Sequence, residues 1–208
     1  ERLVGSEMCI RDRMGIEHAE MLGYEGDDVA GSLAKLGQKK DDEVTLFTSD
    51  KDFLQLLDDH IQIHALKKGL TDVIEYTKDN VVEKFGCRAD QIVDFKALAG
   101  DPSDNYKGVP GIGDKTAFKL LSEYNHLEDI LEAYKGDEKT SVGKKLNAGG
   151  DEGRICLKIA TIITDLNVEE FYDKALIKHP NFSELKDYFK KLDLVKYASS
   201  IDKLIIEQ

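Results

Sequence analysis

The sequence predicts an α/β protein, in which a partial parallel sheet with its helices is followed by an all-helical subdomain carrying a helix–hairpin–helix. Three observations support this class. A β-rich run at residues 43–49 has the length of a buried parallel strand. A helical segment at residues 27–40 precedes it, so that helices and strands alternate in the first part of the chain. After residue 77, the apolar residues recur mostly at helical spacing.

Each element has a local reason in the sequence. The helix at 27–40 begins with acids and ends with lysines, as the helix dipole favours, and the segments at 78–86 and 89–100 each end at a glycine. In order, the first half is expected to contain a strand (16–22), a helix (27–40), a strand (43–49), a short helix (50–59) and a hairpin of two strands (61–66 and 73–77). The expected helices of the second half cover residues 78–86, 89–100, 115–124, 127–134, 153–163 and 182–194.

These elements suggest two subdomains. We expect an α/β subdomain over residues 14–87 and a helical subdomain over residues 88–208. Residues 1–13 show no clean periodicity and do not begin with Met, so we expect them to be a non-native leader.

The composition limits the classes of function. The net charge of −12 argues against a simple basic nucleic-acid binder. It fits either a solvated acidic surface or acids gathered around metal ions. No apolar run approaches the roughly 18–20 residues needed to span a membrane. Cys9, Cys87 and Cys156 are few and widely spaced, which indicates reduced thiols in a cytoplasmic protein rather than a zinc site.

Acidic residues gather at three places in the chain. "YEGDD" precedes the first long helix, "TSDKD" follows the predicted buried strand, and "GDPSDN" follows a helix. Each cluster alone fits helix capping or a polar turn. Together they suggest a metal site, because strand ends meet at one edge of a sheet and converging carboxylates repel one another without cations. Ligation by oxygen alone suits Mg²⁺ or Mn²⁺, and a pair of such ions can hydrolyse phosphodiesters.

The stretch "GVPGIGDKTAFKLL" begins with a glycine loop and continues into a helix. Gly111 and Gly113 would let the backbone approach a phosphate closely, and the N–H groups of the helix start favour an anion. Predicted helices on both sides complete a helix–hairpin–helix, which contacts the nucleic-acid backbone without reading bases. The other reading is an ordinary turn between helices. The spacing does not meet that of a Walker loop.

Four segments resemble the 5′-nuclease family, which includes the 5′→3′ exonuclease domain of bacterial DNA polymerase I and the flap endonucleases. The segments are "GYEGDDVAGSLAKL", "TLFTSDKDFLQLL", "ALAGDPSDNYKGVPGIGDKTAFKLL" and "IATIITD". Gly26, Ser49 and Lys107 stand where that family usually has Ala, Gly and Pro. The resemblance runs from about Met14 to about Leu194 and implies a PIN-like α/β subdomain.

The resemblance also implies roles for individual residues. Glu25, Asp27 and Asp28 would bind a first catalytic metal ion, and the carboxylates of Asp50, Asp52, Asp101 and Asp104 would bind or support a second. Two Mg²⁺ or Mn²⁺ ions are therefore expected, with K⁺ at the hairpin loop as a further expectation. The loop residues expected to hold DNA are Gly108, Val109, Gly111, Ile112, Gly113, Lys115 and Thr116.

The implied function is a structure-specific 5′→3′ exonuclease or flap endonuclease that acts in replication and repair. Its expected partner is DNA with a 5′ flap, a nick or a free 5′ end, and the intact protein could carry a linked polymerase. We expect a cytoplasmic location beside the bacterial nucleoid. The family's N-terminal strands and basic arch have no counterpart upstream of Tyr24, so the chain is expected to be an N-terminally truncated fragment with weak or no activity. The alternative is a non-catalytic DNA-binding module that uses only the helix–hairpin–helix.

Overall fold

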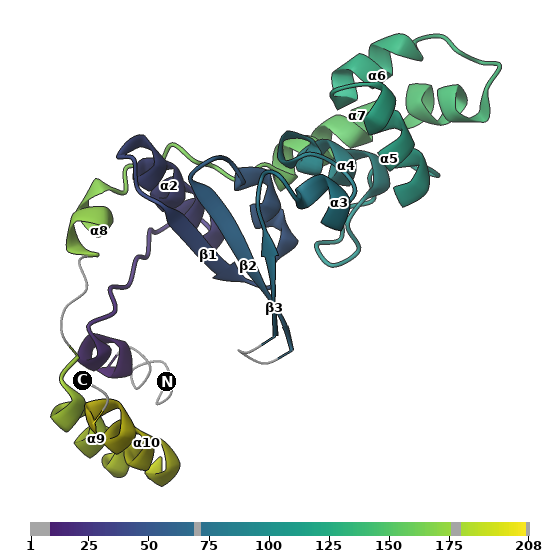
Figure 1. Ribbon diagram of the computed structural model, residues 1–208. Coiled ribbons are helices and arrows are strands. Elements are labelled where there is room, and N and C mark those ends of the chain that lie inside the picture. Colours follow the sequence, from purple (N-terminus) through teal and green to yellow (C-terminus); the bar gives the residue numbers. More distant parts are fainter. Residues whose placement is uncertain (1–8, 69–71, 176–179, 207–208) are drawn as a thin grey trace. The chain divides into compact units, whose positions relative to one another are not determined.

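A computed structural model describes residues 9–68, 72–175 and 180–206 (Figure 1). The chain divides into two compact units. One comprises Glu25–Leu166, and the other comprises Glu1–Tyr24 together with Asn167–Gln208. All the predicted site residues belong to the unit Glu25–Leu166.

That unit contains a mixed three-stranded sheet in the order β1-β2-β3. β1 (Val44–Thr48) pairs in parallel with β2 (Ile61–Lys68), and β2 pairs antiparallel with β3 (Asp72–Tyr76). The predicted hairpin is therefore confirmed, although residues 69–71 of its turn lie outside the described residues. Because β1 and β2 are parallel, their carboxyl ends lie at the same edge of the sheet, where ligands bind in sheets of this kind.

The helix α2 (Gly26–Lys39) lies next to β1 (Figure 1). Its first turn is acidic and its last turn ends in Lys39, in agreement with the predicted helix. Ala34 of α2 is buried with Leu56 and Ile61, which attaches the helix to the sheet. The expected helix at 50–59 is shorter and tighter, a 3₁₀ helix η1 over Lys51–Leu56.

The rest of this unit is helical, as predicted. Its elements are α3 (Val81–Lys84), η2 (Ala89–Gln91), α4 (Ile92–Ala99), α5 (Asp114–Glu123), α6 (Leu127–Ala133) and α7 (Ser141–Ala160). One hydrophobic core continues from the sheet into these helices, since Ile63 and Tyr76 of the strands belong to the same buried cluster as Leu98 and Leu127. This shared core holds the sheet and the helices in a fixed relation.

Helix α7 is much longer than the predicted helix at 153–163. Four glycines over residues 141–153 obscured it, because glycine disfavours helix interiors. In the structure all four are closely packed, and Gly149 and Gly153 lie against the hairpin loop. A Cβ on Gly149 would lie 2.6 Å from Pro110 Cδ, and one on Gly153 would lie 3.0 Å from Val109 Cγ2. These glycines let α7 pack closely against the hairpin loop.

The second unit contains a helical segment at residues 9–14, followed after residue 166 by α8 (Glu169–Lys174), α9 (Phe182–Lys191) and α10 (Val195–Ile206). Leu185 and Phe189 of α9 pack with Ala198 and Ile201 of α10. Ile10 lies against this cluster, and residues 1–8 of the expected leader lie outside the described residues.

The predicted strand at residues 16–22 is wrong. These residues form no strand, and Leu22 is 99% exposed. A strand needs a neighbouring backbone to pair with, and no ladder in the described part of the chain includes this segment. Helices α8 and α10 were not predicted.

Two simpler expectations are consistent with the structure. Cys9, Cys87 and Cys156 are free thiols. Across the described ranges, no helix combines the length and the apolar character needed to cross a membrane.

Candidate metal centre and hairpin loop

The first predicted ligand to consider, Asp52, lies just beyond the carboxyl end of β1. The chain turns there through successive side-chain hydrogen bonds. Thr48 Oγ1 accepts from Asp50 N at 3.0 Å, and Asp50 Oδ1 accepts from Asp52 N at 2.9 Å. Asp50 thereby caps η1, and Asp52 in the first turn is only 9% exposed. The local sequence thus places one carboxylate at the sheet edge and uses another to hold the turn.

A tight turn presents Asp101 and Asp104. Helix α4 ends at Gly100, whose φ of 82° breaks the helical path. Asp101 and Tyr106 then exchange two backbone hydrogen bonds of 3.0 and 2.8 Å. Inside this turn Asp101 Oδ1 accepts from Ser103 N at 2.9 Å, which fixes the orientation of the carboxylate.

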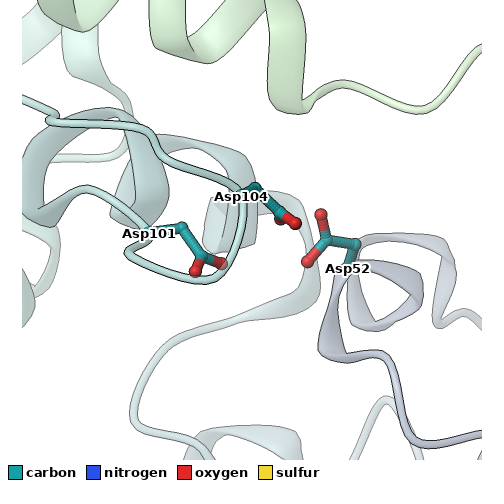
Figure 2. A group of neighbouring side chains, drawn as sticks. All are labelled: Asp52, Asp101 and Asp104. Atoms are coloured by element: carbon teal, nitrogen blue, oxygen red, sulfur yellow. The ribbon is translucent and has the colours of Figure 1, made fainter.

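The structure brings these two segments together. Oxygen atoms of Asp52, Asp101 and Asp104 lie within 4.8 Å of one another. In Figure 2, the Asp104 carboxylate points toward Asp52, while Asp101 lies on the same turn as Asp104. Because the three donors are all carboxylate oxygens, this arrangement suits a hard divalent cation such as Mg²⁺ or Mn²⁺.

A buried lysine lies among these carboxylates. Lys96 of α4 is only 5% exposed, and its ammonium pairs with Asp52. Its Nζ is also 2.8 Å from Asp101 Oδ2 and 3.5 Å from Asp104 Oδ2. One cationic group therefore contacts all three acids, and a divalent ion at this place would share or take over their oxygens.

Burial and the lysine act on the protonation of these groups in opposite directions. Burial raises the pKa of Asp52 to about 6, although the bond from Lys96 lowers it and the charge of Asp50 adds to the rise. Burial also raises the pKa of Asp101, but the hydrogen bonds from Lys96 and Ser103 outweigh it and hold the pKa at about 2. Burial lowers the pKa of Lys96, yet its bonds to Asp101 and Asp52 raise it overall, so the ammonium stays charged.

The remaining predicted ligands are not members of this close set of carboxylates. In the searched part of the chain, the one set of three candidate ligands is that of Asp52, Asp101 and Asp104, without Glu25, Asp27, Asp28 or Asp50. Asp28 Oδ1 instead accepts from Ile163 N at 2.8 Å, and Asp27 Oδ1 accepts from Asp28 N at 2.8 Å. In the structure, these carboxylates organise the start of α2.

The motif "IATIITD" also has a defined place in the structure. Gln55 of η1 donates to Ala160 O at 3.1 Å and accepts from Ile162 N at 2.9 Å. Ser32 of α2 donates to Ile163 O at 3.2 Å. The motif therefore ties the end of α7 to both the carboxylate-bearing η1 and helix α2.

The hairpin loop lies between α4 and α5, as predicted, and its residues divide into two groups. Gly108, Val109 and Ile112 are buried, and the N–H groups of Val109 and Ile112 donate to Leu98 O and Val109 O. These three positions anchor the loop. The exposed positions are Gly111, Gly113 and Lys115, and Thr116 is half-buried.

Two lysines at these sites escaped the sequence analysis. Lys96 lies five positions before Asp101 with Phe95 and Ala97 beside it in the chain, and this apolar sequence context was the available signal. Lys145 of α7 donates to Gly111 O at 2.8 Å. It lies in the part of α7 that was not predicted, so the sequence offered no way to associate it with the loop.

Comparison with known families gives two adjacent matches. A family model described as the 5′-3′ exonuclease N-terminal resolvase-like domain matches residues 7–86. A second, described as the 5′-3′ exonuclease C-terminal SAM fold, matches residues 87–183. Together they cover the sheet, the three-carboxylate group and the hairpin loop.

Curated relatives are bacterial DNA polymerases. The chain is 34% identical over 192 residues to DNA polymerase I of Lactococcus lactis subsp. cremoris, covering 91% of this chain and 22% of that protein. It is 41% identical over 158 residues to DNA polymerase I of Bacillus subtilis, covering 76% of this chain and 18% of that protein. The chain thus spans about a fifth of the length of these relatives.

Several solved structures have a similar fold. T5 5′-exonuclease, solved with divalent metal ions (zinc), is 25% identical, with a TM-score of 0.61 over 86% of this chain and 61% of that one. The bacteriophage T5 D15 flap endonuclease, solved with DNA and metal ions, is 25% identical, with a TM-score of 0.61 over 82% of this chain and 60% of that one. The catalytic core of Rad2 has a TM-score of 0.66 at 16% identity, over 99% of this chain and 68% of that one, which supports the fold alone.

Proposed function

This chain belongs to the 5′-3′ exonuclease family, and we propose that its Asp52, Asp101 and Asp104 form part of a divalent-metal site for hydrolysis of DNA phosphodiesters. One observation carries the proposal. Three carboxylates from two separate segments place oxygen atoms within 4.8 Å of one another at the end of a parallel strand. Asp52 and Asp101 are shielded from solvent and Asp104 is exposed, and carboxylates gathered this closely repel one another unless cations lie between them.

The donor set fits Mg²⁺ or Mn²⁺, which would supply an activated water and a stabilising charge for the phosphate. The residues of the chain prepare that site. Asp50 and Ser103 hold the backbone turns that orient Asp52 and Asp101. Lys96 keeps the three acids close together when no metal ion neutralises them.

We propose that Glu25, Asp27 and Asp28 bind the other ion of a pair, and that Asp50 supports the ion held by Asp52, Asp101 and Asp104. Electrostatics support a place for Glu25 near this site. Burial raises the pKa of Tyr106, and the charges of Asp104, Asp52 and Glu25 add to the rise. Tyr106 pairs with Asp101 across the turn that carries Asp101 and Asp104. The charge of Glu25 therefore acts on a residue that belongs to this turn.

The substrate we propose is DNA with a 5′ flap, a nick or a free 5′ end, held at the hairpin loop. Gly111, Gly113 and Lys115 are exposed there, and α5 begins directly after Gly113. The first backbone N–H groups of a helix have no partner within it, which suits a phosphate. A K⁺ ion at this loop would have to share the Gly111 carbonyl with Lys145, whose ammonium already occupies it. A linked polymerase and a cytoplasmic, nucleoid-associated location are the corresponding proposals for the whole protein.

The test measures cleavage and binding of a labelled 5′-flap duplex in Mg²⁺. We expect Asp52→Ala to abolish whatever cleavage the chain shows and to leave binding through the hairpin loop in place. Lys115→Ala should weaken binding instead. If the chain binds the duplex without cleaving it, and Asp52→Ala changes neither result, the chain is the alternative, a non-catalytic DNA-binding module. If the chain cleaves the duplex and Asp52→Ala cleaves it equally well, the metal role proposed for Asp52 is wrong.

A further inference from the structure

A cavity of about 730 Å³ opens beside the three carboxylates, and two kinds of side chain line it. Asp52, Asp101 and Asp104 line it together with Lys96. The phenylalanines Phe85, Phe95 and Phe118 line it as well. A metal ion held by the carboxylates would bind a phosphate. Neither the ion nor the phosphate explains why aromatic side chains line the same cavity.

The three rings form one fixed cluster. Phe95 and Phe118 are stacked, with centroids 4.4 Å apart and planes at 16°. Phe85 stands edge-on to both, with centroid distances of 5.5 and 6.1 Å. All three pack against the hydrophobic core on one side and remain partly exposed. Because they come from α3, α4 and α5 and their margins, the cluster holds its shape without a ligand.

Positive charge lies next to these rings. Lys51 Nζ is 6.0 Å from the centroid of the Phe85 ring, and Lys84 also lines the cavity. Lys84 is held by a 2.6 Å bond from its Nζ to Glu75 O. The cavity therefore combines a group of carboxylates, the ammonium groups of Lys51, Lys84 and Lys96, and an aromatic wall formed by the three phenylalanines. A nucleotide has the matching parts, namely a phosphate to be bound through cations and a flat base with π faces.

We propose that Phe85, Phe95 and Phe118 form a nucleobase subsite, which holds the base of the nucleotide next to the phosphate that is cut. Lys51 contacts the neighbouring phosphate. The proposal rests on the nuclease function proposed above and adds a contact to a base. A base can reach the wall only after it leaves its stack in the duplex, which costs least for an unpaired or mismatched base. The subsite thus favours a cut where the terminal base pair is already open.

The experiment uses the full chain and a 5′-flap duplex, with Ca²⁺ as the divalent ion. The nucleotides beside the junction carry a normal base, an abasic site or 2-aminopurine. We expect the abasic site at one of these positions to weaken binding roughly 5- to 100-fold, the range for loss of one base–aromatic stack. The 2-aminopurine at the same position should lose fluorescence on binding, and this readout needs no variant.

Substitutions then test whether the phenylalanines hold the base. Phe85→Leu and Phe95→Leu should weaken binding of the normal DNA at least fivefold, and should leave the weaker binding of abasic DNA unchanged. Phe47→Leu is the matched control, because Phe47 on β1 is 66% exposed and does not line the cavity. Its binding should equal that of the unmodified chain.

The outcomes separate the two proposals. If the chain binds flapped DNA but binds abasic and normal DNA equally at every junction position, without a change in 2-aminopurine fluorescence, the nucleobase subsite is wrong and the nuclease proposal stands. If the chain binds no flapped DNA at all, both proposals fail.

Discussion

The backbones of Gly100 and Gly108 approach each other so closely that neither position can accept a side chain. A Cβ on Gly100 would lie 2.8 Å from Lys107 O, and one on Gly108 would lie 2.8 Å from Leu98 O and closer still to Gly100 N. Gly100 begins the turn that carries Asp101 and Asp104, and Gly108 begins the hairpin loop. This contact sets the distance between the candidate metal centre and the candidate DNA contact.

Replacement of Gly108 by Ala tests that contact. Gly108 has a φ of 60°, so a side chain there is both strained and blocked by backbone. We expect Gly108→Ala to lower the free energy of unfolding by at least about 1–3 kcal/mol, as measured by urea denaturation. Gly26→Ala is the control, since nothing lies within 4 Å of its Cβ position. Equal stability of the two variants would contradict the assigned role.

Replacement of Lys96 tests the charge balance of the three carboxylates. Lys96→Met removes the cation that contacts Asp52, Asp101 and Asp104. In the absence of divalent ions, we expect the free energy of unfolding to fall by about 3–5 kcal/mol, because the buried carboxylate of Asp52 loses its cationic partner. Mg²⁺ should raise the melting temperature of this variant more than that of the unmodified chain, because it binds only the folded state.

A matched control for Lys96 exists in the same unit. Lys35 pairs with Asp58 at 2.5 Å, away from the three-carboxylate group. Lys35→Met should lose stability without any added response to Mg²⁺. If Mg²⁺ stabilises the two variants equally, Lys96 does not stand in for a metal ion.

The start of α6 should make stability depend on pH. The bond from Asp94 raises the pKa of His126, and the charges of Asp90 and Asp129 add to the rise while burial opposes it. A folded-state pKa above the unfolded value means that the stabilisation is complete below the unfolded pKa of about 6.5 and is lost as pH rises through the folded pKa. The His126 side chain is 49% exposed, so we expect its ion pair with Asp94 to add only about 0.2–1 kcal/mol to the free energy of unfolding.

Comparison of the chain with His126→Gln over a series of pH values measures this contribution. The difference in unfolding free energy should be largest below the unfolded pKa of about 6.5 and should shrink as pH rises above it, because folded His126 loses its proton at higher pH than the unfolded chain does. Arg154 and Glu128 line a cavity together with His126, and both stay charged over this pH range. A difference that stays constant with pH would show that the Asp94–His126 pair does not stabilise the fold through its charge.

The hairpin loop should respond to salt in proportion to its charge contacts. We expect Lys115→Ala to weaken binding of a 5′-flap duplex and to reduce the slope of log affinity against log salt by about 1, as for one lost phosphate contact. Lys135 forms its ion pair with Glu132 on the surface, and Lys135→Ala should leave both quantities unchanged. An unchanged slope in Lys115→Ala would remove Lys115 from the proposed interface.

The sequence predicted those parts of the fold that depend on local chemistry. Helix α2, strand β1, the β2–β3 hairpin and the helices around the loop follow from capping residues, periodicity and glycine stops. The sequence did not predict the elements whose formation depends on contacts between residues far apart in the chain. The glycines of α7 look like helix breakers until their packing on Pro110 and Val109 is known. Residues 16–22 have strand character, but no strand in the described part of the chain pairs with their backbone.

The same division applies to the candidate site. The strand end and the polar turn identified Asp52, Asp101 and Asp104, and the structure places them together. Glu25, Asp27 and Asp28 were grouped with them by sequence motif, whereas Asp28 bonds to Ile163 in the structure. Lys96 was missed because its partners are separated from it in the chain, and a lysine in a helix is ordinarily solvated.

Binding of Mn²⁺, followed by electron paramagnetic resonance in the absence of DNA, tests the central claim most directly. The chain should bind Mn²⁺, and Asp52→Asn and Asp101→Asn should each weaken that binding at least tenfold. Glu132→Gln, which removes an exposed carboxylate elsewhere, should not weaken it. If Asp52→Asn and Asp101→Asn bind Mn²⁺ as tightly as the unmodified chain, or if the unmodified chain binds none, the three carboxylates do not form a metal site.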